Sequence, residues 1–235
     1  NLESVTYGNN QFIVWGSGSI LTSPDGIMWT DRSCGKNCSF SSVTYGNNQF
    51  IIVGNRGIVL TSPDGVTWTE RYSGTKRQLK SVTYGNNQFI AVGDNGTILT
   101  SPDGIIWAER SSGTKWSLYS VTYGNKQFIV VGSNGTILTS TDGVIWTERN
   151  AGITQNLCSV TYGNNQFIAV CKNDIILTSP DGITWTERSY GTTTELFAWA
   201  VAYCKNQFIA VGYKGQILTS PDGVSWTKRS SGTKS

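Results

Sequence analysis

The stretch "TSPDGITWTER" at residues 178–188 is one of six near-copies, and this repetition constrains the fold more than any other feature. A second motif, "SVTYGNNQF" or a relative, begins at Ser4, Ser42, Ser81, Ser120, Ser159 and Ala200, so successive repeats are 38 to 41 residues apart. A fixed period near forty, filled with short strands, predicts a β-propeller in which each repeat makes one four-stranded blade.

Each repeat contains four segments enriched in β-branched and aromatic residues and bounded by turn residues. In the third repeat these predicted strands, A to D, are 81–85, 88–93, 97–101 and 105–110. The A–B turn "GNNQ", the B–C turn "GDNG" and the C–D turn "SPDG" are rich in residues that adopt positive φ or preset a turn.

The predicted fold class is therefore all-β: a six-bladed β-propeller with four antiparallel strands per blade and a pseudo-sixfold repeat of about 39 residues. We expect a single domain over 1–235, with blades at approximately 4–34, 42–73, 81–112, 120–151, 159–190 and 200–231. Joining residue 235 to residue 1 reproduces the layout of the internal linker 71–82, which predicts a closed ring. The chain begins without methionine, which indicates a processed or partial product.

The repeated Asp and Trp have a structural interpretation. In "SPDG" proline presets the turn, Asp accepts hydrogen bonds from the following backbone N–H groups, and Gly takes the conformation that other residues avoid. The Trp three residues later is expected on strand D, buried between blades. The turn residues are Asp25, Asp64, Asp103, Asp142, Asp181 and Asp222, and the structural tryptophans are Trp29, Trp68, Trp107, Trp146, Trp185 and Trp226.

The "SPDG…W" pattern resembles the Asp-box of bacterial neuraminidase repeats, with one residue fewer between Asp and Gly. The blade order and turn are also similar to WD-repeat propellers. The overall repeat pattern "YGNNQFIAVGDNGTILTSPDGITWT" resembles the repeats of propellers grouped with neuraminidases and photosystem II assembly factors. The resemblance spans the whole chain and implies the propeller fold, but such propellers have unrelated functions.

The sequence predicts no enzyme activity, no cofactor and no metal site. It contains no histidine, the most frequent general base and zinc ligand. Eleven of the 15 carboxylates recur with the repeat, which leaves Glu3, Asp94, Asp174 and Glu195 outside it. The net charge of +3 is spread along the chain, which argues against nucleic acid as a partner. No apolar run approaches the length that spans a bilayer, so we expect no membrane insertion.

Five cysteines depart from the repeat: Cys34, Cys38, Cys158, Cys171 and Cys204. A symmetric hairpin in which Tyr162 faces Phe167 would place Cys158 opposite Cys171, within disulfide reach. Cys34 and Cys38 are a second candidate disulfide, and Cys204 is left over. These pairs favour a secreted or extracytoplasmic location over unrelated thiols. The glycosylation-like triplets at Asn37, Asn95 and Asn134 are interpreted as turns.

The repeats differ from one another mainly in the D–A linkers and B–C turns, which should emerge together on one face. Candidate ligand-binding aromatics there are Tyr72, Trp116, Tyr119, Tyr190, Trp199 and Tyr213, while Trp15 on strand B is expected to be buried. The residue before strand A also varies between the repeats. This variation predicts that the mouth of the propeller channel is lined asymmetrically, by Glu3, Ser41, Lys80, Tyr119, Cys158 and Trp199.

The leading functional hypothesis is a multivalent carbohydrate-binding, lectin-like propeller, in which recurring sites gain strength through avidity. The alternative is a protein–protein interaction scaffold that uses the asymmetric D–A/B–C loop face. A more remote alternative is a recently amplified or engineered repeat protein without a specific ligand. The oligomeric state is left open.

Overall fold

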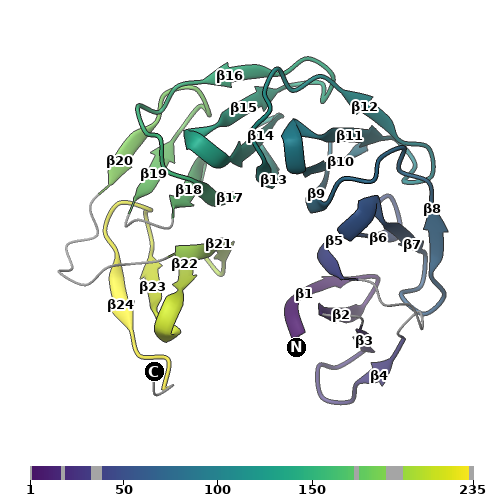
Figure 1. Cartoon of the computed structure of the whole chain (residues 1–235). Coiled ribbons are helices and arrows are strands. Elements are labelled where there is room, and N and C mark those ends of the chain that lie inside the picture. The colour runs from purple at the N-terminus through teal and green to yellow at the C-terminus, as the bar shows by residue number, and fades with distance from the viewer. Residues whose placement is uncertain (1, 17–18, 33–38, 172–174, 189–197, 233–235) are drawn as a thin grey trace. The chain divides into compact units, whose positions relative to one another are not determined.

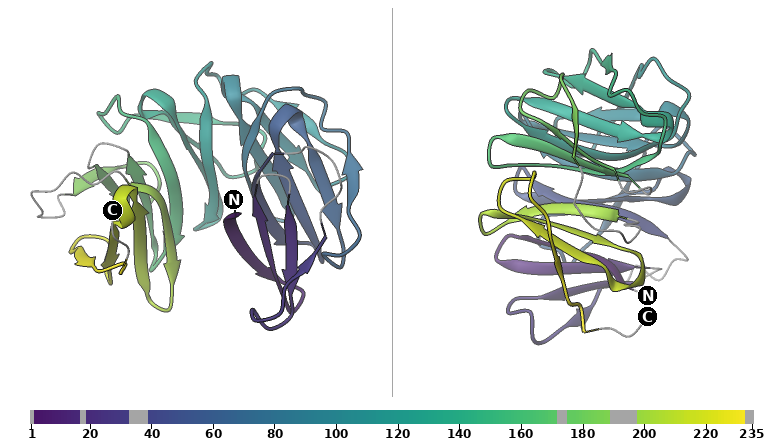
Figure 2. Two further views of the ribbon diagram at one scale, coloured as in Figure 1. Left: turned by 60° about the horizontal axis from the view of Figure 1, so that its bottom comes forward. Right: turned by 90° about the vertical axis from the view of Figure 1, so that its left-hand side faces the viewer.

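Twenty-four short strands alternate with tight turns along the computed structural model, which describes residues 2–16, 19–32, 39–171, 175–188 and 198–232. The strands form six four-stranded sheets, each an antiparallel meander in which neighbours in sequence are neighbours in the sheet (Figures 1 and 2). The chain divides into two units, Asn1–Thr114 and Lys115–Ser235, which are described separately.

The first unit contains sheets 1 to 3. Sheet 1 has β1 (Leu2–Gly8), β2 (Gln11–Gly16), β3 (Ile20–Ser23) and β4 (Thr30–Asp31). Sheet 2 has β5 (Phe40–Gly46), β6 (Gln49–Gly54), β7 (Val59–Ser62) and β8 (Thr69–Arg71), with the 3-10 turn η1 (Asn55–Gly57). Sheet 3 has β9 (Leu79–Gly85), β10 (Gln88–Gly93), β11 (Ile98–Ser101) and β12 (Ala108–Arg110), with η2 (Asp94–Gly96).

The second unit contains sheets 4 to 6. Sheet 4 has β13 (Leu118–Gly124), β14 (Gln127–Gly132), β15 (Ile137–Ser140) and β16 (Thr147–Arg149), with η3 (Ser133–Gly135). Sheet 5 has β17 (Leu157–Gly163), β18 (Gln166–Cys171), β19 (Ile176–Ser179) and β20 (Thr186–Arg188). Sheet 6 has β21 (Ala198–Cys204), β22 (Gln207–Gly212), β23 (Ile217–Ser220) and β24 (Thr227–Arg229), with η4 (Tyr213–Gly215).

The A–B turn is a two-residue hairpin in every sheet. Both central residues have positive φ, between 45° and 60°, for example Asn47 and Asn48. Two consecutive left-handed residues match the twist of the flanking strands, and Asn tolerates this conformation better than most residues. The predicted turn is confirmed, and the four 3-10 turns are the only helical elements in the described part of the chain. None of them is long and apolar enough to cross a membrane.

The first strand of each sheet begins two residues earlier than predicted, because a β-bulge interrupts its pairing with the second strand. In sheet 5, Tyr162 pairs with Phe167 as predicted, and Ser159 pairs with Val170. Beyond the bulge, however, Leu157 pairs with Cys171, and Cys158 is the extra residue.

The structure does not form the predicted Cys158–Cys171 disulfide, and in the bulge the residue that pairs with Cys171 is Leu157. The structure holds both residues as thiols, and the Cys158 thiol donates to the Asn156 carbonyl at 3.8 Å. Cys34 and Cys38 lie outside the described residues. The extracytoplasmic location stays a prediction.

The C–D turn has the predicted chemistry in all six sheets. In sheet 2, the backbone N–H groups of Val66 and Thr67 both donate to Oδ1 of Asp64 at 2.9 Å, and the Ser62 hydroxyl donates to the same oxygen. The Trp68 indole N–H donates to the Gly65 carbonyl at 3.1 Å. Because the carboxylate occupies these N–H groups, the last strand starts after the Trp and is shorter than the predicted "ITWTER".

The same contacts lower the pKa of each turn aspartate below the ordinary value of 3.8, since two backbone N–H groups stabilise the charged form. A lowered folded-state pKa means that the unfolded chain binds protons more readily. The stabilisation is present above the unfolded pKa and is lost as the pH falls through the folded pKa.

We predict that thermal stability, measured by circular dichroism between pH 7 and pH 2.5, falls progressively below about pH 4, the unfolded Asp pKa. Asp103→Asn keeps an oxygen acceptor but no titratable group, so this variant should show a shallower acid slope. An acid slope identical to that of the unmodified chain would contradict the role of the turn carboxylates.

The core lies between neighbouring sheets within each unit, and the second strands supply its largest side chains. Phe50, Phe89, Phe128, Phe167 and Phe208 are fully buried. Each of them packs against the Tyr of the first strand in its own sheet, with ring centroids 4.6–4.7 Å apart. Alternation along a half-buried strand accounts for this arrangement.

The repeated tryptophans cover the edges of these cores. Trp68, Trp107, Trp185 and Trp226 pack against clusters shared by two adjacent sheets, and Trp226 is the most buried of them. Trp29 departs from the prediction, because 38% of its surface is exposed.

Three residues of the "SVTYGNNQF" motif connect one sheet to the next. A Cβ on Gly46 would lie 2.1 Å from Cγ of Tyr84 in the following sheet, so only glycine fits. The Ser42 hydroxyl accepts the Val82 N–H at 3.2 Å, and the Gln49 amide donates to the Asp103 carbonyl at 2.7 Å. Equivalent contacts recur between sheets 4, 5 and 6. In sheet 6 the glycine position is Cys204, whose side chain is exposed.

Gly46→Ala should lower the free energy of unfolding by about 1–3 kcal/mol, because the added methyl overlaps the Tyr84 ring. Urea denaturation measures this loss. In a chain that already carries Tyr84→Ala, the same substitution should cost much less, since the overlapping ring is gone. Equal costs in both backgrounds would show that the overlap is not the cause.

Trp15 is buried as predicted, with 3% of its surface exposed in the core between sheets 1 and 2. Its indole N–H has no hydrogen-bond partner among the described residues. A buried donor without a partner costs about 1–3 kcal/mol.

Trp15→Phe removes the donor and keeps most of the ring, so thermal stability should be unchanged or higher. Trp15→Ala creates a cavity and should lower the free energy of unfolding by about 3–5 kcal/mol. A large loss of stability in the Phe variant would show that the indole N–H has a stabilising partner.

Candidate functional site

In sheets 2, 3 and 4 the B–C turn lies between two D–A linkers, the one that enters the sheet and the one that leaves it. In sheet 2 the Asn55 N–H donates to the carbonyl of Ser39, in the linker that enters the sheet, at 2.9 Å. Gly57 lies against the carbonyl of Thr75, in the linker that leaves the sheet, where a Cβ would lie 2.1 Å from that oxygen. Sheets 3 and 4 repeat both contacts. The variable segments of a sheet therefore lie side by side, as predicted.

The central residue of each described 3-10 turn is left-handed, with φ between 54° and 56°. Asn occupies this position in η2 and η3, whereas η1 has Arg56 and η4 has Lys214. The left-handed conformation disfavours long side chains but suits Asn. Arg56 and Lys214 are therefore long cationic side chains at a position whose backbone conformation favours Asn.

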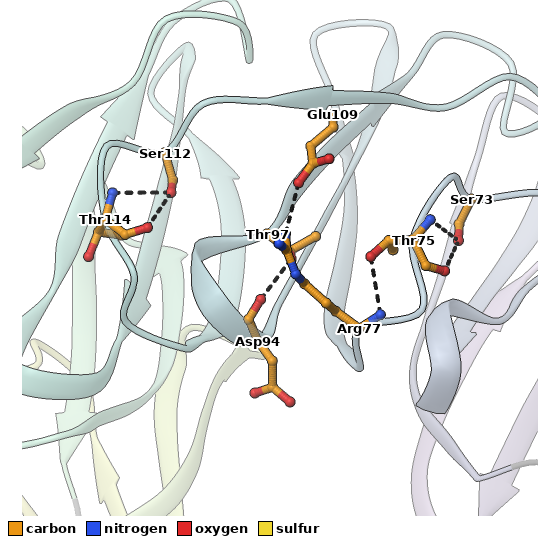
Figure 3. A network of polar contacts seen from close by, with 8 residues as sticks. All are labelled: Ser73, Thr75, Arg77, Asp94, Thr97, Glu109, Ser112 and Thr114. Atoms are coloured by element: carbon orange, nitrogen blue, oxygen red, sulfur yellow. Dashed lines mark hydrogen bonds and ion pairs between the residues drawn. The ribbon is translucent and has the colours of Figure 1, made fainter.

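The linker after sheet 2 is held by its own hydroxyl groups. The buried Ser73 hydroxyl donates to the Thr75 carbonyl at 3.2 Å and accepts the Thr75 N–H at 3.4 Å. The Arg77 N–H donates to the Thr75 hydroxyl at 3.1 Å. Ser112 and Thr114 repeat the first two contacts after sheet 3 (Figure 3). Each linker therefore has a defined course past its 3-10 turn.

In sheet 3 the space beside the 3-10 turn holds a side chain of the protein itself. The Arg77 guanidinium donates to the Thr97 hydroxyl at 3.3 Å and to the Glu109 carboxylate at 3.0 Å (Figure 3). Both partners of the ion pair are about half exposed, so it adds little stability in water. The contact nevertheless places a cation between η2 and β12.

In sheet 2 the described residues beside the 3-10 turn line a cleft of about 930 Å³. It is bounded by η1, the end of β8 and the linker that leaves the sheet. Ser39, Asn55, Arg56, Gly57, Ile58, Glu70, Arg71, Tyr72, Ser73, Thr75 and Lys76 line it. We call this the sheet 2 cleft.

The charged side chains of the sheet 2 cleft are mostly positive. Arg56 and Lys76 are exposed, Arg71 is half-buried, and Glu70 is the one carboxylate among the lining residues. The Arg71 Nε–H donates to the Thr61 hydroxyl at 3.0 Å, which restrains its guanidinium. The cleft can therefore offer several N–H donors to an anionic group.

The candidate aromatics differ in their exposure and in their contacts. Tyr72 is 86% exposed and lines the sheet 2 cleft. Trp116, Trp199 and Tyr213 are about half exposed, whereas Tyr119 is half-buried and its hydroxyl accepts a hydrogen bond from Ser133 at 2.7 Å. Tyr190 lies outside the described residues. Tyr72 thus lines a cleft that the structure describes.

The variable residue before strand A is the bulge residue, and in sheets 3 and 4 it contacts the first residue of the B–C turn. Lys80 forms an ion pair with Asp94 at 2.8 Å, and Tyr119 contacts Ser133. Both pairs are separated by 14 residues, and Trp199 and Tyr213 occupy the same two positions in sheet 6. The residue before strand A and the first residue of the B–C turn therefore vary together from sheet to sheet.

Sequence reasoning missed the cations of the sheet 2 cleft. Arg71 recurs in every repeat and so was not singled out, and Lys76 lies in a linker of ordinary composition. The available signal was Arg56, which stands where the third and fourth repeats have Asn. Among the described residues, no group of three or more Cys, Asp or Glu could hold a metal ion.

The comparisons with known proteins identify the fold. No protein-family model matches the chain, and no curated protein matches it. Among solved structures, "YCF48 bound to D1 peptide" has 18% identity and a TM-score of 0.77, covering 97% of this chain and 80% of that one.

Two further structures are similar at low identity. YCF48 from Cyanidioschyzon merolae has 19% identity and a TM-score of 0.75, over 97% of this chain and 84% of that one. The computationally designed Ika8 protein has 13% identity and a TM-score of 0.77, over 100% and 76%. With its six four-stranded sheets, the chain has the fold of a six-bladed β-propeller.

Proposed function

We propose that this chain is a non-enzymatic protein-interaction propeller that binds a peptide segment of a partner at the sheet 2 cleft. The observation that carries the proposal is Tyr72, which is 86% exposed at the rim of a cleft of about 930 Å³. Exposed aromatic side chains beside a concave surface are frequent anchors of protein interfaces. The size of the cleft lies within the range of ligand sites.

A comparison of the repeats favours this function over a multivalent lectin. A lectin with one weak site per blade needs lining residues that recur. At the position of Tyr72 the next two repeats have Ser111 and Asn150, and at that of Arg56 they have Asn95 and Asn134. Carbohydrate binding stays a second hypothesis that the exposed aromatics support.

The structural neighbour supports the same choice. In one of the similar structures, YCF48 is bound to a D1 peptide. At 18% identity the likeness concerns the fold, and it supports the idea that a propeller of this fold can bind a peptide. The variable loops of the present chain would serve the same purpose with different side chains.

Peptides selected from a random display library against the intact chain provide the test, with affinities measured by fluorescence anisotropy. Tyr72→Ala should weaken the selected peptides at least tenfold, because it removes the aromatic anchor. Ile106→Ala, at a residue that is 72% exposed in a C–D turn, is the control for general surface hydrophobicity and should leave affinity unchanged.

A glycan array run in parallel distinguishes the two hypotheses. Peptide binding that depends on Tyr72, with a silent array, supports the interaction scaffold. Specific glycan hits with several sites per chain, and no peptide selected, would replace it with the lectin.

A further inference from the structure

The sheet 2 cleft differs from its counterpart in sheet 3 in how its cations are balanced. At the positions of sheet 3 that correspond to the lining residues of the cleft, the charged side chains are Asp94, Glu109, Arg110 and Lys115, two of each sign. In the sheet 2 cleft, Arg56, Arg71 and Lys76 share one lining carboxylate, Glu70. The cleft therefore carries an excess of positive charge that the same fold neutralises one sheet away.

Arg56 also occupies a backbone conformation that does not suit it. Its φ of 56° and ψ of 27° are left-handed; the equivalent positions in η2 and η3 hold Asn, and the one in η4 holds Lys214. A left-handed conformation costs a residue other than Gly, Asn or Asp roughly 1–2 kcal/mol. Strain of this kind is frequent where a side chain serves a ligand.

We propose that the sheet 2 cleft recognises a carboxylate group of the bound peptide, with Arg56 and Arg71 as the ligating guanidinium groups. This inference rests on the proposed function and names the chemistry of the partner: an acidic segment. Guanidinium groups bind carboxylates through paired N–H donors, and this geometry is specific as well as strong. Lys76 adds a mobile point charge at the rim, and Tyr72 packs against the residue next to the acidic one.

Arg71 is suited to this role by its existing contact. Its Nε–H is held by Thr61 at 3.0 Å, so the guanidinium is restrained before a ligand arrives. This contact uses one of the five N–H donors of the group. Restraint before binding reduces the entropy lost on association. Arg110 makes the same contact to Thr100 at 3.0 Å in sheet 3 and provides a matched control.

The experiment uses three fluorescein-labelled decapeptides and the intact chain. One is an amidated peptide of alternating Glu and Tyr, the second has Gln in place of Glu, and the third is the Gln peptide with a free C-terminal carboxylate. We expect the Glu peptide to bind at least tenfold more tightly than the amidated Gln peptide. Its affinity should fall as salt rises from about 0.05 to about 0.5 M, because salt screens exposed charges. Preferential binding of the third peptide would identify a chain terminus as the source of the carboxylate.

The variants separate recognition from folding. Arg56→Asn restores the residue that η2 and η3 carry, so it should preserve or raise thermal stability while weakening the Glu peptide at least tenfold. Arg71→Gln should also weaken it at least tenfold. Arg110→Gln loses an equivalent contact to threonine in sheet 3 and should leave the affinity unchanged.

Three results would overturn the assignment. The first is equal affinity for the Glu and Gln peptides. The second is a loss of affinity in Arg110→Gln as large as that in Arg71→Gln. The third is binding of a uronic-acid oligosaccharide in place of the acidic peptides. If display-selected peptides still depend on Tyr72 but not on Arg56 or Arg71, the proposed function stands and the carboxylate assignment fails.

Discussion

The carboxylate of the C–D turn is the interaction on which the rest of the structure depends. In each sheet one Asp oxygen accepts two backbone N–H groups, and the neighbouring serine hydroxyl donates to it. The backbone carbonyl of the same Asp accepts the glutamine of the preceding sheet wherever two adjacent sheets are described within one unit. One residue thus closes a hairpin and joins two sheets, which explains why "SPDG" hardly varies between repeats.

This arrangement leaves the opposite loops free to change. The A–B and C–D turns carry the contacts between sheets, so their substitution disturbs the core. The B–C turns and D–A linkers are held mainly by backbone contacts and by their own hydroxyl groups. Their exposed side chains can therefore differ between repeats at little cost, as expected for binding loops on a rigid scaffold.

Sheets 2 and 3 show how small differences produce different surfaces. Their linkers have the same length and the same Ser–Gly–Thr segment, so the backbone follows an equivalent course. In sheet 3 the protein places its own guanidinium between η2 and Glu109, and in sheet 2 the described residues of the cleft carry an excess of positive charge. The proposed recognition of a carboxylate follows from this difference in charge balance.

The sequence by itself determined the number of repeats, the hairpin turns and the role of the repeated Asp, because these follow from local preferences and a fixed period. It could not locate the β-bulge at Cys158 or the short final strands, since both arise from competition between backbone hydrogen bonds. Only the tertiary structure decided which loop residues meet. Arg56, Arg71 and Tyr72 gather in one cleft because η1 and the following linker pack against each other, whereas Tyr119 is held by Ser133. Such contacts depend on distances between separate loops, which no periodic pattern encodes.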